Sequence, residues 1–243
     1  MYNKTNIEID HADIVITHEC MNHCPFCIDK FVHTSNNVVS ETDVAKFMRK
    51  LKSVTDKDIE VLFLGGEPTC AGVDKLYVLA NIVRSYGYSP IISTNNPSKQ
   101  LVCELLPCFD WIQVTVHNDS QIDFYRQYKE KINVKWSGDQ YMDIHKFNHF
   151  INSTVDFPRR SISMYFTPDF QELCTDKEVW KILDSLEWKR NGSYLYSFYK
   201  GVRIKRCING ETNIIDEPTV PKLYPNGNYN KTWNNEDLDD YLI

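Results

Sequence analysis

Six short apolar runs alternate with segments of helical periodicity over about the first 185 residues. The apolar runs are residues 12–18, 59–65, 89–95, 111–117, 132–138 and 161–167. The helical segments are residues 41–54, 73–87, 98–106, 120–130, 139–153 and 171–187. Such alternation is typical of a parallel sheet with crossover helices. We therefore predict an α/β fold, a partial (β/α)6 barrel that resembles the closed TIM barrel of about 250 residues.

Two local signals mark helix ends. Ser40 precedes the first helical segment and Asp43 follows three residues later, a pattern that predicts an N-terminal cap. Gly87 closes the second helical segment, where glycine commonly ends a helix.

The pattern changes from about residue 190 onward. The stretch SYLYSFYKGVRIKRC predicts two strands around Lys200 and Gly201, and KLYPNGNYNKTWN is rich in turn-forming and aromatic residues. We predict a barrel over residues 1–190 and a small C-terminal β extension over residues 191–243, packed against or over the barrel.

Composition limits the class of protein. The 243 residues are 42% hydrophobic and 25% charged, which suits one sizeable globular domain with a small extension. A net charge of -6 gives no footprint for non-specific nucleic-acid binding. No secretory signal and no run of about 18 apolar residues is evident, so we expect a cytoplasmic protein without a membrane segment. In that reducing compartment, cysteines are more often thiols or metal ligands than disulfides.

Three of the eight cysteines are clustered. Cys20, Cys24 and Cys27 directly follow the first predicted strand, at the edge where β/α folds place active sites. Structural zinc sites use four ligands, commonly two separate cysteine pairs, whereas this spacing can supply three ligands of a [4Fe-4S] cluster and leave one iron open. We interpret the other five as small buried apolar side chains: Cys70, Cys103, Cys108, Cys174 and Cys207.

A second motif, FLGGEPT, follows the second predicted strand. Gly65 and Gly66 allow close approach of the backbone to a ligand, and the carboxylate of Glu67 with nearby carbonyls can hold a cationic amino group. Because the two motifs end adjacent strands, we expect them to form one pocket.

The C-x3-C-x2-C motif, with Phe26 before its last cysteine, and the GGEP motif together resemble the radical S-adenosylmethionine (SAM) superfamily. The resemblance implies that SAM chelates the open iron, and that an electron from the cluster cleaves it into methionine and a 5'-deoxyadenosyl radical. By this resemblance Cys20, Cys24 and Cys27 ligate iron, Gly65, Gly66 and Glu67 bind the methionyl amine, and Phe26 lies near the adenine.

Family members often place further SAM contacts at the ends of the later strands. The candidates by position are Ser93, Thr94, Asn95, Asn96, Gln113, Thr115 and His117. The G-x-I-x-G-x-x-E pattern of some members is absent, so no motif assigns the adenine contacts. For His117 the alternative is a hydrogen-bonded histidine at a strand end.

Three other signals have structural alternatives. His145 and His149 lie four apart on a predicted helix, which we interpret as an exposed polar face because HKFNH lacks the glutamate of HExxH. His18 and His23 could complete a zinc site with two of the clustered cysteines, which would leave GGEP unexplained. The Arg159–Arg160 pair either meets an anion or is simply solvated.

The predicted function is a radical SAM enzyme that abstracts hydrogen from a substrate with the help of a low-potential electron donor of the flavodoxin or ferredoxin type. A ribosomally made peptide is the first choice, since the tail faintly resembles the SPASM or twitch regions of peptide maturases. Cys174 and Cys207 are too few to enclose an auxiliary cluster there. The alternatives are a nucleotide or other small metabolite, a glycyl-radical activase, and a non-enzymatic electron carrier or zinc module.

Overall fold

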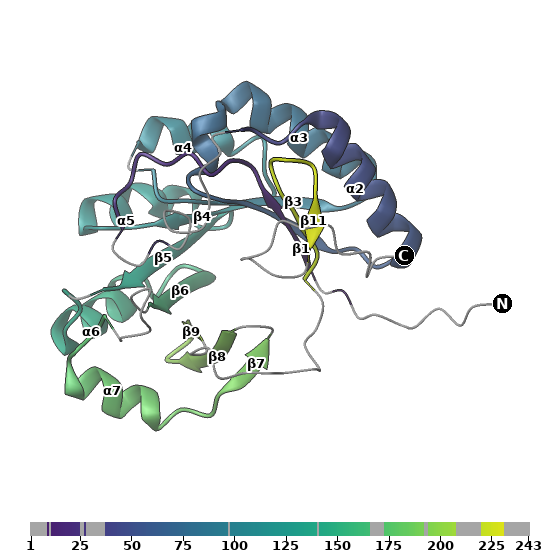
Figure 1. Ribbon diagram of the computed structural model, residues 1–243. Coiled ribbons are helices and arrows are strands. Elements are labelled where there is room, and N and C mark those ends of the chain that lie inside the picture. The colour runs from purple at the N-terminus through teal and green to yellow at the C-terminus, as the bar shows by residue number, and fades with distance from the viewer. Residues whose placement is uncertain are drawn as a thin grey trace.

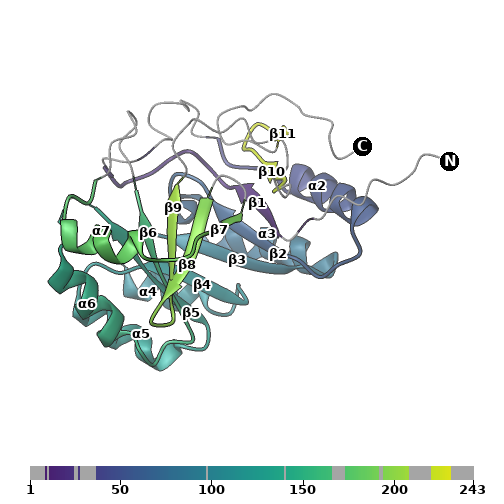
Figure 2. The same ribbon diagram turned by 90° about the horizontal axis from the view of Figure 1, so that it is seen from below.

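The computed structural model describes residues 9, 11–24, 27, 37–96, 98–139, 141–165, 173–191, 194–207 and 220–230. These residues form one curved sheet of eleven strands in the order β11-β10-β1-β2-β3-β4-β5-β6-β9-β8-β7. Helices α2 to α7 lie along its outer side (Figures 1 and 2). None of the helices in the described part of the chain is both long and apolar enough to cross a membrane.

Six parallel strands in chain order make up the centre of the sheet. They are β1 (His11–Val15), β2 (Glu60–Leu64), β3 (Ser89–Thr94), β4 (Trp111–Thr115), β5 (Ile132–Gly138) and β6 (Arg159–Met164). Each overlaps one of the predicted apolar runs, so the partial α/β barrel is confirmed.

The helices follow the predicted segments and are shorter at most ends. They are α2 (Glu41–Val54), α3 (Val73–Ser85), α4 (Lys99–Leu105), α5 (Asp119–Tyr125), α6 (Ile144–Ser153) and α7 (Lys177–Asp184), with two short 3-10 helices, η1 (Pro68–Ala71) and η2 (Arg126–Tyr128). Ser40 caps α2 by accepting the Asp43 N–H at 3.1 Å. Gly87, with φ +83°, ends α3. Both predicted helix ends are confirmed.

The two faces of the sheet differ in chemistry. Side chains on the helix side are apolar and fully buried, as for Phe63, Val114 and Ile162. Because side chains alternate along a strand, their neighbours point to the inner face. There Gln113 donates to the Ser93 hydroxyl at 2.8 Å, and Asn133 donates to the Gln113 side chain at 3.3 Å. The inner face of the partial barrel is therefore polar at its centre.

Strands of the tail extend this sheet at both ends. The predicted hairpin is present as β8 (Tyr194–Tyr199) and β9 (Val202–Cys207), with positive φ at Lys200 and Gly201. β7 (Lys189–Asn191) pairs with β8, and β9 pairs in parallel with β6. At the other end, β10 (Lys222–Leu223) pairs in parallel with β1 and carries β11 (Tyr229–Asn230). The division at residue 190 stays a prediction.

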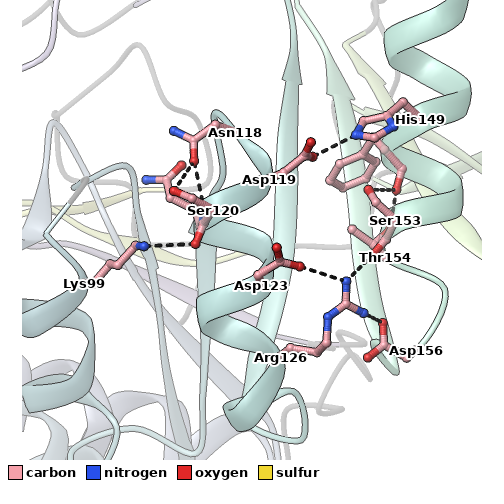
Figure 3. Close-up of polar contacts among 12 residues, drawn as sticks. Lys99, Asn118, Asp119, Ser120, Asp123, Arg126, His149, Ser153, Thr154 and Asp156 are labelled. Atoms are coloured by element: carbon pink, nitrogen blue, oxygen red, sulfur yellow. Dashed lines mark hydrogen bonds and ion pairs between the residues drawn. The ribbon is translucent and has the colours of Figure 1, made fainter.

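The outer surface between α5 and α6 is held by ion pairs (Figure 3). Arg126 contacts Asp156 and Asp123 and donates to the Ser153 carbonyl at 2.9 Å. His149 lies 2.8 Å from Asp119, and both side chains are more than half exposed. His145 is exposed as well, which confirms the polar helix face predicted for the two histidines.

Candidate active site

The cysteine loop begins where β1 ends. Cys20, Cys24 and Cys27 are half-buried and form no disulfide. The Cys27 N–H donates to the Cys24 carbonyl at 3.2 Å, and the Asn22 N–H donates to the Cys20 sulfur at 3.3 Å. Phe26, predicted to lie near the adenine, falls outside the described residues. The loop thus presents three sulfur donors at the carboxyl edge of the sheet.

The glycine motif packs directly against this loop. The Gly66 N–H donates to the Thr17 carbonyl and the Glu67 N–H to the Glu19 carbonyl, both at 2.8 Å. A Cβ at Gly65, where φ is +136°, would lie 2.3 Å from the Thr17 oxygen, and one at Gly66 would lie 2.5 Å from the Glu19 oxygen. Close approach of the backbone was predicted for a ligand, and the structure shows such an approach between the two motifs themselves.

The carboxylate of Glu67 is buried, with 1% of the residue exposed, and is held by four hydrogen bonds. Its Oε1 accepts from the Thr69 N–H and hydroxyl at 3.1 and 2.8 Å and from the Thr94 hydroxyl at 2.7 Å. Its Oε2 accepts from the Asn95 N–H at 2.8 Å. A carboxylate oxygen accepts more than one hydrogen bond, so Oε2 can also receive a cationic amino group.

Asn95 joins the two motifs to the next strand. Its backbone N–H binds Glu67, its side-chain amide donates to the Cys24 sulfur at 3.8 Å, and its Oδ1 lies 2.7 Å from His117 Nε2. The His117 N–H in turn donates to the Gln121 side chain at 2.7 Å. His117 is therefore a hydrogen-bonded histidine after β4 that also contacts the predicted cofactor pocket.

The other positional candidates divide between this network and the inner face. Asn96 donates to the Thr69 hydroxyl at 3.1 Å and approaches the Met21 sulfur at 4.0 Å. It therefore links the end of the glycine motif to the cysteine loop. Ser93 and Gln113 bind each other on the inner face. Thr115 is buried at the end of β4, in register with Lys135 of β5. Their predicted contacts with SAM stay predictions.

Cys70 was predicted as a buried apolar side chain, and this is wrong because its thiol is half-buried beside the cysteine loop. Burial, then the charges of Glu19 and Glu67, and then the nearby Cys20, raise the pKa of Cys70. Burial also raises the pKa of Cys20, with Glu67 adding to the effect and the Asn22 N–H opposing it. Deprotonating either thiol is therefore harder than in water.

The remaining cysteines differ in their surroundings. Cys108 and Cys174 are buried, as predicted. Cys103 is only half-buried and lies 3.8 Å from the Tyr128 hydroxyl, so the buried interpretation is wrong for it. The side chain of Cys207 falls outside the described residues.

The Arg159–Arg160 pair is bound to backbone carbonyls. Arg159 donates to Glu130 at 3.0 Å, and Arg160 donates to Ile151 and Lys200 at 2.9 and 2.7 Å. The pair therefore connects β6 to the segment before β5, to α6 and to the turn between β8 and β9. Neither interpretation from the sequence contained this role.

The donor set suits an iron-sulfur cluster. Within the described residues, no three His, Cys, Asp or Glu side chains are placed to share one metal ion. A [4Fe-4S] cluster does not require such convergence, because each thiolate binds a different iron. Three partly accessible thiols on one loop, none of them in a disulfide, supply the donors for that arrangement.

Comparison with known proteins gives a family match. The family described as the radical SAM superfamily matches residues 14–157, a span that contains both motifs. No curated protein matches the chain.

Several solved structures are similar at low sequence identity. Streptococcus suis SuiB bound to precursor peptide SuiA matches with a TM-score of 0.52 and 17% identity, over 65% of this chain and 40% of SuiB. Native anSMEcpe with bound AdoMet and Cp18Cys peptide matches with a TM-score of 0.45 and 14% identity, over 63% of this chain and 50% of that protein. BtrN in complex with AdoMet and 2-DOIA matches with a TM-score of 0.42 and 18% identity, over 53% of this chain and 57% of BtrN. The chain matches about half the length of these proteins, and the likeness to SuiB concerns the fold.

Proposed function

The chain belongs to the radical SAM superfamily, and we propose that it abstracts hydrogen from a ribosomally synthesised peptide. The family's cofactors are a [4Fe-4S] cluster and SAM, and Cys20, Cys24 and Cys27 would hold the cluster. When bound, these cofactors supply a 5'-deoxyadenosyl radical that takes a hydrogen atom from the substrate. The observation that carries the proposal is the hydrogen-bonded junction of the cysteine loop, the glycine motif and the end of β3.

Each part of this junction has a task in binding SAM. The Glu67 carboxylate, with the backbone of Gly65 and Gly66, would receive the methionyl amine. Thr69 and Thr94 fix one carboxylate oxygen, so that the other is oriented before SAM arrives. Such orientation in advance lowers the cost of binding and keeps reacting groups in line.

Support for a peptide substrate comes from two sides. SuiB, which has the same fold, was solved with a precursor peptide. The tail of this chain, which resembles the twitch regions of peptide maturases, adds the strands β8 and β9 beside β6 and so extends the sheet, with Arg203 and Lys205 of β9 on its inner face. A nucleotide or other small metabolite is the second candidate, because the same face carries several cationic side chains.

Cofactor chemistry is tested first, without a substrate. The protein is purified without air, loaded with iron and sulfide and reduced with dithionite, which replaces the low-potential donor of the cell. We expect 5'-deoxyadenosine to form from SAM. Cys24→Ala should lose both the cluster absorbance and this product, whereas Cys108→Ala, at a buried thiol in the core cluster, should keep both.

The substrate is tested with a peptide encoded by a short reading frame next to the gene. A mass change in that peptide, with deuterium transferred from labelled peptide into 5'-deoxyadenosine, would support the proposal. If the loaded enzyme cleaves SAM and leaves every such peptide unchanged, the peptide assignment is wrong although the family chemistry holds.

A further inference from the structure

A row of three polar side chains crosses the inner face of β5, β6 and β9. Lys135 is in register with Ser161, and Ser161 with Arg203. Residues in register share one face of a sheet, and the alternating neighbours Ile162 and Ile204 are fully buried on the helix side. Neighbouring strands are about 4.8 Å apart, so Lys135 and Arg203 flank Ser161 across about 10 Å. We call these three residues the basic row.

The basic row contains polar atoms that lack partners. Ser161 is 4% exposed, and its hydroxyl has no hydrogen-bond partner among the described residues. The Nε atom of Arg203 is also buried, and none of the residues that the structure describes forms a hydrogen bond with it. Folded proteins contain few such atoms, because each costs about 1–3 kcal/mol. Here two of them lie on neighbouring strands of one face, where both can donate to a bound group.

The charges of the basic row rest on aromatic rings. The Arg203 guanidinium lies 4.9 Å from the centre of the Tyr196 ring, and Lys135 Nζ lies 5.4 Å from that of Tyr165. Lys205, in register with Ser163, adds a third cation to this face. The sequences of β5, β6 and β9 contain no acidic residue, although the whole chain carries a net charge of -6.

We propose that the basic row binds an oxyanion of the substrate, a carboxylate or a phosphate. A guanidinium offers a planar fork of donors, serine adds a hydroxyl donor, and lysine adds a point charge. The inference rests on the proposed function, in which the cofactor site uses the ends of β1 to β4. Because β5, β6 and β9 are the next strands of the same sheet, the anion anchors the substrate beside that site.

Two sources share this chemistry, an acidic side chain of a peptide and a phosphate of a small metabolite. The probes are therefore an acetylated tri-glutamate peptide and inorganic pyrophosphate, with tri-glutamine as the neutral control. Each is titrated calorimetrically into anoxic protein that carries its cluster and saturating SAM. Arg203→Gln and Ser161→Ala are compared with Arg49→Gln, which removes the same charge from the exposed surface of α2.

We expect one anionic probe to bind and tri-glutamine not to bind. Arg203→Gln should weaken that binding by about tenfold to a hundredfold, the usual effect of losing a charge-assisted hydrogen bond. Ser161→Ala, which removes a single oxygen and so tests the row if the arginine variant fails to fold, should weaken it by about threefold or more. Arg49→Gln should bind like wild type, and the affinity for SAM should not change.

The inference is overturned if neither anion binds, or if the row variants bind as tightly as Arg49→Gln. It is also overturned if the row variants lose affinity for SAM instead, because the row would then hold the carboxylate of the cofactor. Binding of pyrophosphate but not of tri-glutamate supports the basic row and contradicts the peptide substrate, so the two proposals fail separately.

Discussion

Replacement of Gly66 by alanine tests the contact between the two motifs. The added Cβ would lie 2.5 Å from the carbonyl oxygens of both His18 and Glu19, whereas ordinary contacts begin at 3.4 Å. These are backbone atoms and cannot rotate away, so the loops must separate. Separation strains or breaks the hydrogen bonds from Gly66 to Thr17 and from Glu67 to Glu19. Two backbone hydrogen bonds at about 1 kcal/mol each, with the strain of overpacking, give a loss of roughly 3 kcal/mol.

Urea unfolding of the metal-free protein measures this loss, and uptake of iron and sulfide measures its effect on the cysteine loop. The control is Gly87→Ala, where φ is +83° and a Cβ would meet nothing within 4 Å. That variant should lose about 1 kcal/mol through backbone strain and still take up a full cluster. Gly66→Ala should lose more stability and most of its iron. A Gly66→Ala protein with wild-type unfolding and full iron content would refute the steric argument.

Three further changes test single interactions. Thr94→Val removes the hydroxyl that donates to Glu67 and should weaken SAM binding about fivefold in equilibrium dialysis. An unchanged affinity for SAM would contradict the proposed contact between Glu67 and the cofactor. Lys222→Met leaves the nearly buried Asp13 carboxylate without its cation and should cost about 3 kcal/mol in urea unfolding, and a wild-type midpoint would contradict this. Asp176 accepts the N–H groups of Ile144, Glu178 and Val179, and the first of these bonds is the main cause that holds its pKa below the usual value. A lowered pKa stabilises the fold above about pH 4, and this contribution is lost as the pH falls through the folded pKa. The midpoint difference between wild type and Asp176→Ala should therefore be constant from neutral pH to about pH 4 and shrink below it; a constant difference in stronger acid would count against the assignment.

Local signals of the sequence predicted the elements of this fold well. The cap at Ser40 and the stop at Gly87 depend on neighbouring residues alone, and both are confirmed. The end of β1 was predicted too late. Beyond Val15, Ile16 and Thr17 contact other parts of the chain: Ile16 accepts the Val39 N–H, and Thr17 forms an isolated bridge with Val38 and accepts the Gly66 N–H. Such contacts bring together residues far apart in the chain and give no local pattern.

In the tail, too, the sequence predicted two strands and did not predict the pairing with distant strands. Alternation predicted a hairpin at Lys200 and Gly201, and the hairpin is present. Its parallel pairing with β6, and the pairing of β10 with β1, join segments separated by about 40 and 200 residues. Strand residues have the same composition whichever strand they pair with, so the sequence predicted an extension and not its place in the sheet.

Motifs revealed the candidate site only where its residues are consecutive. Cys20, Cys24 and Cys27 and the glycine motif stand out in the sequence, whereas Asn95 was one of seven similar candidates by position. Its importance depends on three elements that meet around it. Cys70 was assigned to the core, although it lies three residues after Glu67 and just beyond the motif. That short distance from the motif was the available signal.

The geometry of Glu67 explains why the two motifs need β3. A buried carboxylate is costly unless hydrogen bonds replace its water, and here Thr69, Thr94 and Asn95 provide them. Two of these three residues follow one another at the end of β3, so burial of the charge fixes the glycine motif to that strand. The same strand end places the Asn95 amide at the Cys24 sulfur. One set of hydrogen bonds therefore both orients the Glu67 carboxylate and contacts the cysteine loop, the two parts of the site that we propose bind the SAM amine and the cluster.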